Sequence, residues 1–222
     1  YTAFDVDISD LVRAGENHIC VKVDNSLEPN CRWYSGSGIY RSVQLVIREP
    51  NHIIDVHIDT VQIRPAQISI SVHTAEVCPV SVYIYDGDKR VVSGTPGVLI
   101  VPDAKLWSDE NPFLYKAVIK TDTDQREFMF GVRLLRWDAQ NGMTVNGQRV
   151  LLRGGCIHHD HGVLGACEYY DAEYRRISIL KNNGFNALRI AHNPASQITL
   201  DICDKLGMYV LNETFDGWYI PK

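Results

Sequence analysis

The sequence predicts a multidomain chain in which β-structure is followed by an α/β segment. Apolar and polar residues alternate up to about residue 133, and from about residue 134 strand patterns alternate with helix patterns. The 222 residues are 45% hydrophobic and 22% charged, which is an ordinary globular composition. This length is sufficient for more than one domain.

Residues 1–49 show the two-residue alternation of half-buried antiparallel strands. The alternating runs lie at 4–8, 19–23 and 43–47. Between them, residues 32–38 read Arg-Trp-Tyr-Ser-Gly-Ser-Gly, a loop whose glycines permit tight turns while its aromatic rings project. Such loops bind ligands or fill domain interfaces, and both interpretations stay open for Trp33. Because the first residue is Tyr1 rather than Met and residues 2–8 already resemble the middle of a strand, we expect the natural amino terminus to lie upstream.

A domain boundary is predicted near Glu49-Pro50-Asn51, after which strand alternation resumes. The predicted strands lie at 54–58, 68–72, 80–84, 98–101, 115–119 and 127–132. Asp86-Gly87 is a hairpin signal that adds one more strand. About seven short strands in about 80 residues are typical of an immunoglobulin-like sandwich. This part shows no cluster of chemically active side chains, and we expect it to be a spacer.

The pattern from residue 134 onward predicts a hairpin and then βα units. The hairpin pairs 143–145 with 150–152 around Asn146-Gly147, and the units that follow are strand 151–157, helix 170–183, strand 186–191, a helix from Asn193-Pro194 to Gly207, and strand 208–211. One face of the first helix carries Tyr170, Tyr174, Ile177 and Leu180. Parallel strands with crossover helices fit either the opening of a barrel or part of an open sheet. A complete (β/α)8 barrel takes roughly 250 residues, so a barrel here would stop after its third strand.

Polar residues gather where each of these strands ends. They are His158-His159-Asp160-His161, His192-Asn193, and Asn212-Glu213 with Asp216 and Trp218. Because carboxyl ends of parallel strands meet at one rim, we interpret His158, His192 and Glu213 as one site. His159 and His161 are interpreted as structural. Neighbours on a strand point to opposite faces, so we expect no dedicated zinc site. The groups suit a polyhydroxylated ligand, with Trp33 or Trp218 as a platform for a sugar ring.

Charge and composition exclude several other classes. The net charge is -5 and the pI is about 5.9, so the chain has no basic field for a nucleic-acid partner. No stretch approaches the roughly 20 apolar residues of a membrane span, and we expect no membrane partner. The six cysteines form no CxxC pair, and we expect them to be small buried hydrophobes.

Six sequence strings resemble motifs of glycoside hydrolase family 2, in that family's order. They are residues 32–41, 106–112, 130–133, 153–160, 182–194 and 206–213. The resemblance implies the C-terminal part of a jelly-roll sugar-binding domain at 1–49, an immunoglobulin-like β-sandwich at 50–133, and the N-terminal part of a TIM-barrel catalytic domain at 134–222. The chain then looks like an interior fragment. Its Gly-Gly-Cys-Ile-His-His-Asp string is most similar to β-galactosidases.

The resemblance implies a glycosidase that hydrolyses terminal non-reducing β-D-galactosyl residues of an oligosaccharide or glycoconjugate by a retaining mechanism with two carboxylates. β-Glucuronidase and β-mannosidase remain open, as does a non-catalytic carbohydrate-binding protein. The family's catalytic glutamates follow the fourth and seventh barrel strands, beyond Lys222, so we expect this chain alone to be inactive. A homo-oligomer is compatible with this reading. The compartment stays open among periplasm, cell exterior and cytoplasm.

The resemblance also implies which residues bind substrate. His158 and His192 match histidines of the sugar subsite, Arg32 lies in a loop over the pocket, and Glu213 matches a non-catalytic site residue. Asn212 stands where the family usually has aspartate, and it is included with Trp218 among the substrate-binding candidates. Some relatives hold magnesium just after the third strand, but the stretch 215–218 departs from that pattern. We therefore expect no cofactor or metal in this segment, with a divalent cation left open for the full-length enzyme.

Overall fold

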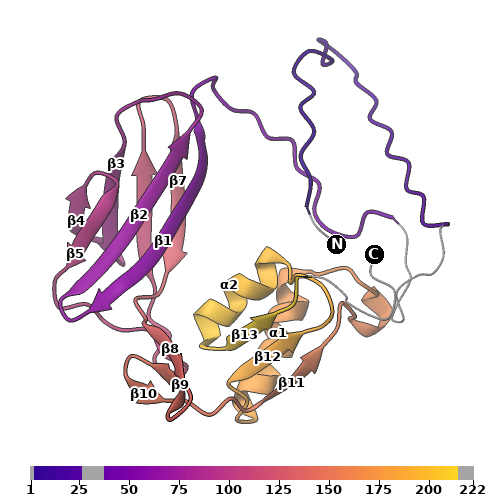
Figure 1. Cartoon of the computed structure of the whole chain (residues 1–222). Helices are drawn as coiled ribbons and strands as arrows, with labels where there is room; N and C mark the ends of the chain where they lie inside the picture. Colours follow the sequence, from indigo (N-terminus) through magenta and orange to yellow (C-terminus); the bar gives the residue numbers. More distant parts are fainter. Residues whose placement is uncertain (1–2, 27–37, 215–222) are drawn as a thin grey trace.

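A computed structural model describes residues 3–26 and 38–214 of the chain. Within these ranges it forms a β-sandwich, a small three-stranded sheet and a parallel βαβαβ segment. Figure 1 shows the N-terminal residues as an extended loop near the βαβαβ segment. In the described ranges, no helix has the length and apolar character needed to cross a membrane.

The N-terminal segment departs from the sequence prediction. Residues 3–26 and 38–50 contain no strand. Three predicted strands are therefore not formed: 4–8, 19–23 and 43–47. Phe4, Ile19 and Val43 are 74%, 74% and 77% exposed instead of half-buried. An alternating segment becomes a strand only when a neighbouring strand takes up its backbone hydrogen bonds and a core covers its apolar face, and the described residues provide neither here. The jelly-roll assignment stays a prediction.

The predicted immunoglobulin-like sandwich is confirmed as seven antiparallel strands in two sheets, with the orders β1-β2-β5 and β4-β3-β6-β7. The strands are β1 (Ile53–Ile63), β2 (Ala66–Thr74), β3 (Ser81–Asp86), β4 (Lys89–Gly94), β5 (Gly97–Val101), β6 (Tyr115–Lys120) and β7 (Gln125–Phe130). The hairpin predicted at Asp86-Gly87 joins β3 to β4. The core lies between the sheets, where Ile68, Ile84 and Ile119 are fully buried.

A small sheet follows the sandwich and contains the predicted hairpin. Its strands, in the order β10-β9-β8, are β8 (Leu135–Asp138), β9 (Gly142–Val145) and β10 (Gln148–Arg149). Asn146 and Gly147 have φ angles of 53° and 81°, which is the left-handed pair that a tight two-residue hairpin turn requires. The second arm is 148–149 rather than the predicted 150–152, because two-residue loop geometry fixes the register immediately after the turn.

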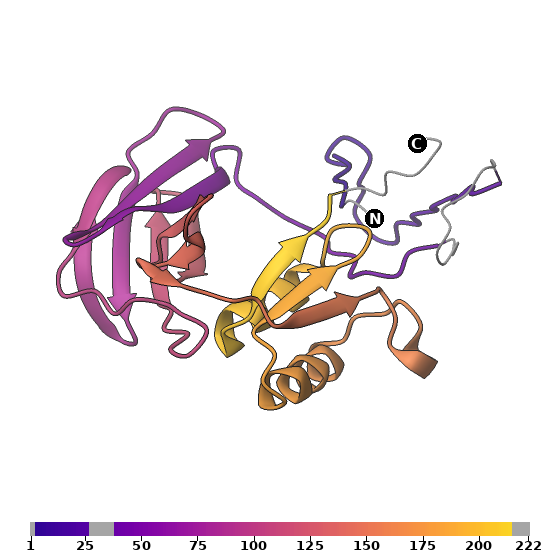
Figure 2. The ribbon, with the colours of Figure 1, turned by 60° about the horizontal axis from the view of Figure 1, so that its bottom comes forward.

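The βα units are confirmed as a parallel sheet in the order β11-β12-β13 (Figure 2). The elements are β11 (Gly154–Ile157), a short 3-10 helix (Gly162–Leu164), α1 (Tyr170–Asn182), β12 (Ala187–Ile190), α2 (Gln197–Leu206) and β13 (Tyr209–Asn212). Ile177 of α1, Ile190 of β12 and Ile202 of α2 share one buried cluster, so both helices cover the same face of the sheet.

Two helix details differ from the prediction. Helix α2 begins after Ser196, whose hydroxyl accepts a hydrogen bond from the Thr199 backbone N–H at 3.2 Å, and not at Asn193-Pro194. On α1, Tyr170 and Tyr174 are 44% and 43% exposed rather than core-facing. The buried side of α1 carries Glu173 in place of a tyrosine, because this carboxylate has polar partners under the helix.

The sandwich and the βαβαβ segment are joined by a buried contact around Trp107 and Asp109. Trp107 is 1% exposed, donates its indole N–H to the Asp204 carbonyl at 2.9 Å, and packs edge-on against Tyr209. The Asp109 carboxylate accepts hydrogen bonds from the Tyr209 hydroxyl at 3.1 Å and the Asn186 amide at 2.9 Å. Except for Asp204, these residues lie in the strings 106–112, 182–194 and 206–213, so one role of those strings is to hold the two domains together.

The five described cysteines are all free, and they do not share one environment. Cys203 is buried as expected, but Cys20 and Cys156 are exposed and Cys78 and Cys167 are intermediate. The expectation of small buried hydrophobes is therefore wrong for most of them, because Cys156 lies on the open face of the parallel sheet and Cys20 on the unpaired N-terminal segment. Cys31 lies outside the described residues.

We predict that thiol reagents distinguish Cys203 from Cys156. Burial, together with the charges of Asp204 and Glu173, raises the pKa of Cys203 to about 12. At pH 8 iodoacetamide should alkylate Cys156 in the native protein and Cys203 only after denaturation, as measured by peptide mass spectrometry. If Cys203 in the native protein were labelled as fast as Cys156, the cluster of buried residues around Cys203 would be accessible to the reagent, which would contradict the prediction.

Candidate functional site

The candidate site lies at the carboxyl ends of the three parallel strands. The register aligns Ile157, Ile190 and Asn212 in one row, so the residues that follow them emerge at the same rim. The rings of His158 and His192 lie there with centroids 5.3 Å apart. The two histidines therefore lie side by side at this rim, as the sequence predicted.

Glu213 is held by a cation that the sequence analysis missed. Its carboxylate forms an ion pair with Arg189, whose Nε lies 2.5 Å from Oε1, and its Oε2 lies 3.4 Å from His192 Nδ1. The Arg189 guanidinium also donates to Cys156 Sγ at 3.3 Å, and the bonds to Cys156 and Glu213 raise the pKa of Arg189. Cys156 and Arg189 occupy one row of the sheet, so β11 and β12 fix this arrangement. The carboxylate is thereby fixed at the rim, where its oxygens can accept hydrogen bonds from a ligand.

Asn212 positions the loop that carries His192. Its side-chain oxygen accepts a hydrogen bond from the Ala195 backbone N–H at 2.8 Å. The loop from residue 191 to residue 196 is thereby tied to the end of β13. A carboxylate at this position could accept the same bond, which accounts for the tolerance of asparagine here. The role of Asn212 toward a substrate stays a prediction.

His159 and His161 turn away from the rim toward buried carboxylates, in agreement with the structural role predicted for them. His159 Nδ1 lies 3.3 Å from Glu168 Oε1, and His161 Nε2 lies 2.8 Å from Glu173 Oε1. Glu173 is fully buried and is also paired with Arg176. A buried carboxylate requires such partners, and together they hold the loop after β11 onto α1.

Arg41 connects the N-terminal segment to this rim. Its guanidinium donates to the Pro194 carbonyl at 2.8 Å and lies 3.9 Å from the Glu168 carboxylate. Pro194 is two residues after His192, so Arg41 supports the loop that presents this histidine. The sequence signal was the string 32–41 that contains Arg41, but a contact across 153 positions cannot be read from local pattern.

We predict that Glu168 makes the protein more stable above about pH 4.5 than below it. Burial opposes its ionisation, but hydrogen bonds from His159 and Ser196 and the charge of Arg41 outweigh burial and hold the pKa of Glu168 below its usual 4.5. The stabilisation is therefore complete above pH 4.5 and is lost as pH falls through the lowered pKa. Glu168→Gln should flatten this part of the curve of melting temperature against pH, whereas Glu76→Gln on the sandwich surface should not. Parallel curves for wild type and Glu168→Gln would contradict the assignment.

Arg32 and Trp218 lie outside the described residues, so their predicted roles in substrate binding stay predictions. Within residues 3–26 and 38–214, no group of three or more His, Cys, Asp or Glu side chains is placed to hold a metal ion. The described rim is therefore a cluster of hydrogen-bonding groups: two imidazoles, one carboxylate paired with a guanidinium, and an exposed thiol.

Two family models match the chain. The model described as "Glycosyl hydrolases family 2" matches residues 44–133, and the model of that family's TIM barrel domain matches residues 138–217. This chain belongs to glycosyl hydrolase family 2. The family resemblance is confirmed, the sandwich coincides with the first match, and the parallel segment is the beginning of the family 2 barrel.

Relatives of this family 2 chain are considerably longer than it is. Beta-galactosidase BoGH2A of Bacteroides ovatus is 33% identical over 100% of this chain and 30% of its own length. A Formosa agariphila relative with a provisional beta-glucuronidase name is 35% identical over 99% of this chain and 23% of its own. A crystal structure of a family 2 member from Bacteroides cellulosilyticus DSM 14838 is 37% identical, with a TM-score of 0.78 over 89% of this chain and 31% of that one. The chain thus spans less than a third of each.

Proposed function

We propose that this chain is part of a longer, retaining, exo-acting β-galactosidase that hydrolyses terminal non-reducing β-D-galactosyl residues of an oligosaccharide or glycoconjugate. The observation that carries the proposal is the rim where His158, His192 and the Glu213–Arg189 pair converge at the ends of three parallel strands. Active sites of barrel enzymes occupy this face. The longer enzyme can be a homo-oligomer or a monomer under this proposal.

Each rim residue has a role toward sugar hydroxyls. The imidazoles of His158 and His192 donate or accept hydrogen bonds according to tautomer, so they can hold adjacent hydroxyls. The ionised Glu213 carboxylate accepts bonds from hydroxyl groups, and charge-assisted bonds of this kind are stronger than neutral ones. Arg189 orients the Glu213 carboxylate through their ion pair. These residues bind and orient the sugar; none of them is proposed to attack it.

Cleavage with retention needs two carboxylic groups about 5 Å apart. One protonates the leaving oxygen while the other attacks the anomeric carbon, and water then releases the sugar from the glycosyl-enzyme with the first group acting as base. We propose that both glutamates lie in the longer enzyme beyond Lys222, after the fourth and seventh barrel strands. Glu213 is assigned to binding and not to attack, because its carboxylate is already engaged by Arg189 and lies 3.4 Å from His192 Nδ1. The steps need no cofactor from this segment, and a divalent cation in the longer enzyme is left open.

A neutral sugar fits the described rim better than a glucuronide. The carboxylate of a glucuronide requires a cation, and at this rim Arg189 is paired with Glu213 while Arg41 lies against Glu168. Arg176, which donates to the His158 carbonyl at 3.4 Å, is likewise paired with Glu173. Among the described residues, these three arginines near the histidines thus already face a carboxylate. β-Glucuronidase is nevertheless the second candidate, because the Formosa agariphila relative and several similar solved structures carry that name.

The test is a comparison of the full-length gene product with the 222-residue chain on nitrophenyl β-D-galactoside, β-D-glucuronide and β-D-mannoside. We expect the galactoside to be hydrolysed fastest, and only by the full-length protein. A preference for the glucuronide would replace the sugar assignment. Binding of galactose without hydrolysis of any glycoside would favour the non-catalytic carbohydrate-binding alternative. Turnover by the short chain would contradict the placement of the catalytic pair.

A further inference from the structure

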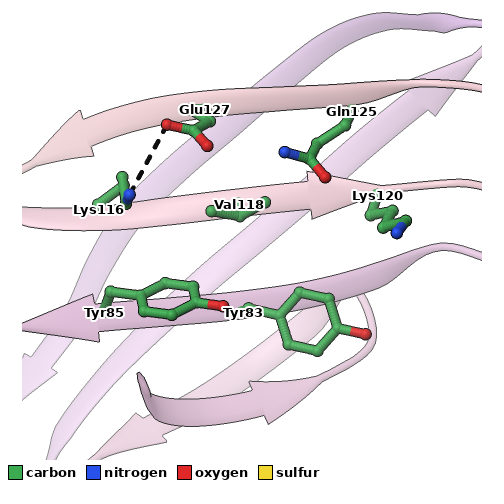
Figure 3. Close-up of a pocket in the computed structure, with 7 residues that line it drawn as sticks. All are labelled: Tyr83, Tyr85, Lys116, Val118, Lys120, Gln125 and Glu127. Atoms are coloured by element: carbon green, nitrogen blue, oxygen red, sulfur yellow. Dashed lines mark ion pairs between the residues drawn. The ribbon is translucent and has the colours of Figure 1, made fainter. Parts of the chain in front are cut away.

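The sandwich carries an open depression on the outward face of sheet β4-β3-β6-β7, remote from the rim in sequence and on a different domain (Figure 3). Its volume is about 360 Å³, and Val118 lies in its floor. We call this surface the tyrosine face, and it is formed by Tyr83, Tyr85, Lys116, Lys120, Gln125 and Glu127. From its sequence this domain is expected to be a spacer, and none of the functions assigned above uses the tyrosine face.

Strand register puts these side chains on one side of the sheet. Tyr83 and Tyr85 are alternate residues of β3, so their side chains lie on the same face of the sheet, and their Cα atoms are separated by about 7 Å. Tyr85 pairs across the sheet with Lys116, and Lys120 pairs with Gln125. Figure 3 shows both tyrosine side chains along β3, with lysine, glutamine and glutamate on the next two strands. Aromatic rings therefore lie beside a row of polar groups on a flat, open surface.

The charge of this surface is opposite to that of the chain. The Arg90 guanidinium lies 5.5 Å from the centre of the Tyr83 ring, and the Lys116 ammonium lies 5.4 Å from that of Tyr85. The tyrosine face itself has two cations, Lys116 and Lys120, and one carboxylate, Glu127, which lies 3.8 Å from Lys116; Arg90 borders the face as a further cation. The whole chain carries a net charge of -5. A cationic aromatic surface on an acidic protein favours an anionic ligand.

We propose that the tyrosine face is an accessory binding surface for an anionic polysaccharide. The apolar faces of sugar rings can pack on Tyr83 and Tyr85, the cations can pair with carboxylate or sulfate groups, and Gln125 can bond hydroxyls. An open, flat depression suits an extended chain better than a small molecule, which is normally enclosed by its pocket. The choice of a saccharide rests on the proposed function. Uronate and sulfate share the chemistry that the surface recognises.

The experiment is affinity electrophoresis of the full-length enzyme in native gels that contain polygalacturonate, a sulfated galactan or a neutral galactan. Galactose is added throughout to occupy the active site. We expect both anionic polymers, or one of them, to retard the enzyme and the neutral galactan to retard it much less. Tyr83→Ala/Tyr85→Ala should weaken the apparent affinity roughly tenfold and Lys120→Gln severalfold, whereas Trp137→Ala, at an exposed tryptophan of β8, should have no effect.

All three variants should hydrolyse nitrophenyl β-galactoside like the wild type, so failure of the proposed activity is visible separately from failure of the surface. If the double variant does not fold, Lys120→Gln still tests the cationic contribution. Retardation that is absent, equal in neutral galactan, or unchanged in the variants overturns the proposal. So does a change of oligomeric state in the double variant without a change in retardation, because a second copy of the chain would then occupy this surface.

Discussion

Glu213→Gln in the full-length enzyme is expected to lower kcat/KM on its preferred nitrophenyl glycoside by on the order of 100-fold. The substitution keeps the shape of the side chain but removes the charge that accepts hydrogen bonds and that pairs with Arg189 and His192. Hydrogen bonds to a charged group contribute about 1.5–3 kcal/mol, which corresponds to roughly 10- to 150-fold in kcat/KM. The measurement is steady-state kinetics at saturating and limiting substrate.

The matched control for this substitution is Asp171→Asn, at an exposed carboxylate in the first turn of α1. It should leave kcat/KM within about twofold of wild type, since surface substitutions away from special features have small effects. The melting temperature of Glu213→Gln should also stay close to wild type. Wild-type activity in Glu213→Gln would remove Glu213 from the site.

Trp107→Ala should reduce the free energy of unfolding by about 3–5 kcal/mol, the usual cost of truncating a large buried aromatic side chain. Trp107 is 1% exposed, its indole N–H bonds to the Asp204 carbonyl, and the Arg133 guanidinium lies 4.4 Å from its ring centre. Truncation opens a cavity between the sandwich and the barrel segment. Denaturant titration of the full-length protein followed by far-UV circular dichroism gives the measurement.

The control is Trp137→Ala, at a tryptophan that is 69% exposed on β8. It should change the free energy of unfolding by less than about 0.5 kcal/mol. A loss of stability equal to that of Trp107→Ala would mean that the effect reflects tryptophan content and not the domain contact. Activity of Trp107→Ala should also fall, because the contact fixes the barrel segment that carries the rim.

The sequence predicted correctly those turns, strands and helix ends that are determined by a few neighbouring residues. The Asn146-Gly147 turn, the strand alternation of the sandwich and the helix stop at Gly207 all follow from backbone preference and side-chain period. Gly207 has a φ angle of 73°, which L-residues rarely adopt, and a Cβ at this position would lie 2.4 Å from the Asp109 carbonyl oxygen. Both the backbone conformation and the close contact therefore require glycine. The alternation of residues 4–8 failed as a predictor because pairing depends on a partner strand, which the local sequence does not encode.

The sequence predicted only those site residues that directly follow the carboxyl end of a predicted strand. His158, His192 and Glu213 were found in that way. Arg189 was missed because it lies within β12, where an arginine reads as a solvent-facing residue of an alternating strand. Arg41 was missed as a partner of Pro194 because the contact joins segments 153 positions apart. The residues at the rim can be predicted from their position in the sequence motifs. The residues that hold them in place come from distant parts of the chain and depend on the tertiary fold.

Trapping of the glycosyl-enzyme is the most direct test of the claim that this chain supplies the binding side of a galactosidase site and not its nucleophile. The full-length enzyme would be incubated with a 2-deoxy-2-fluoro-β-galactoside that carries a good leaving group, digested and mapped by mass spectrometry. We expect one fluorogalactosyl label per chain, on a glutamate outside residues 1–222. A label on Glu213 or on another carboxylate of this chain would contradict the account.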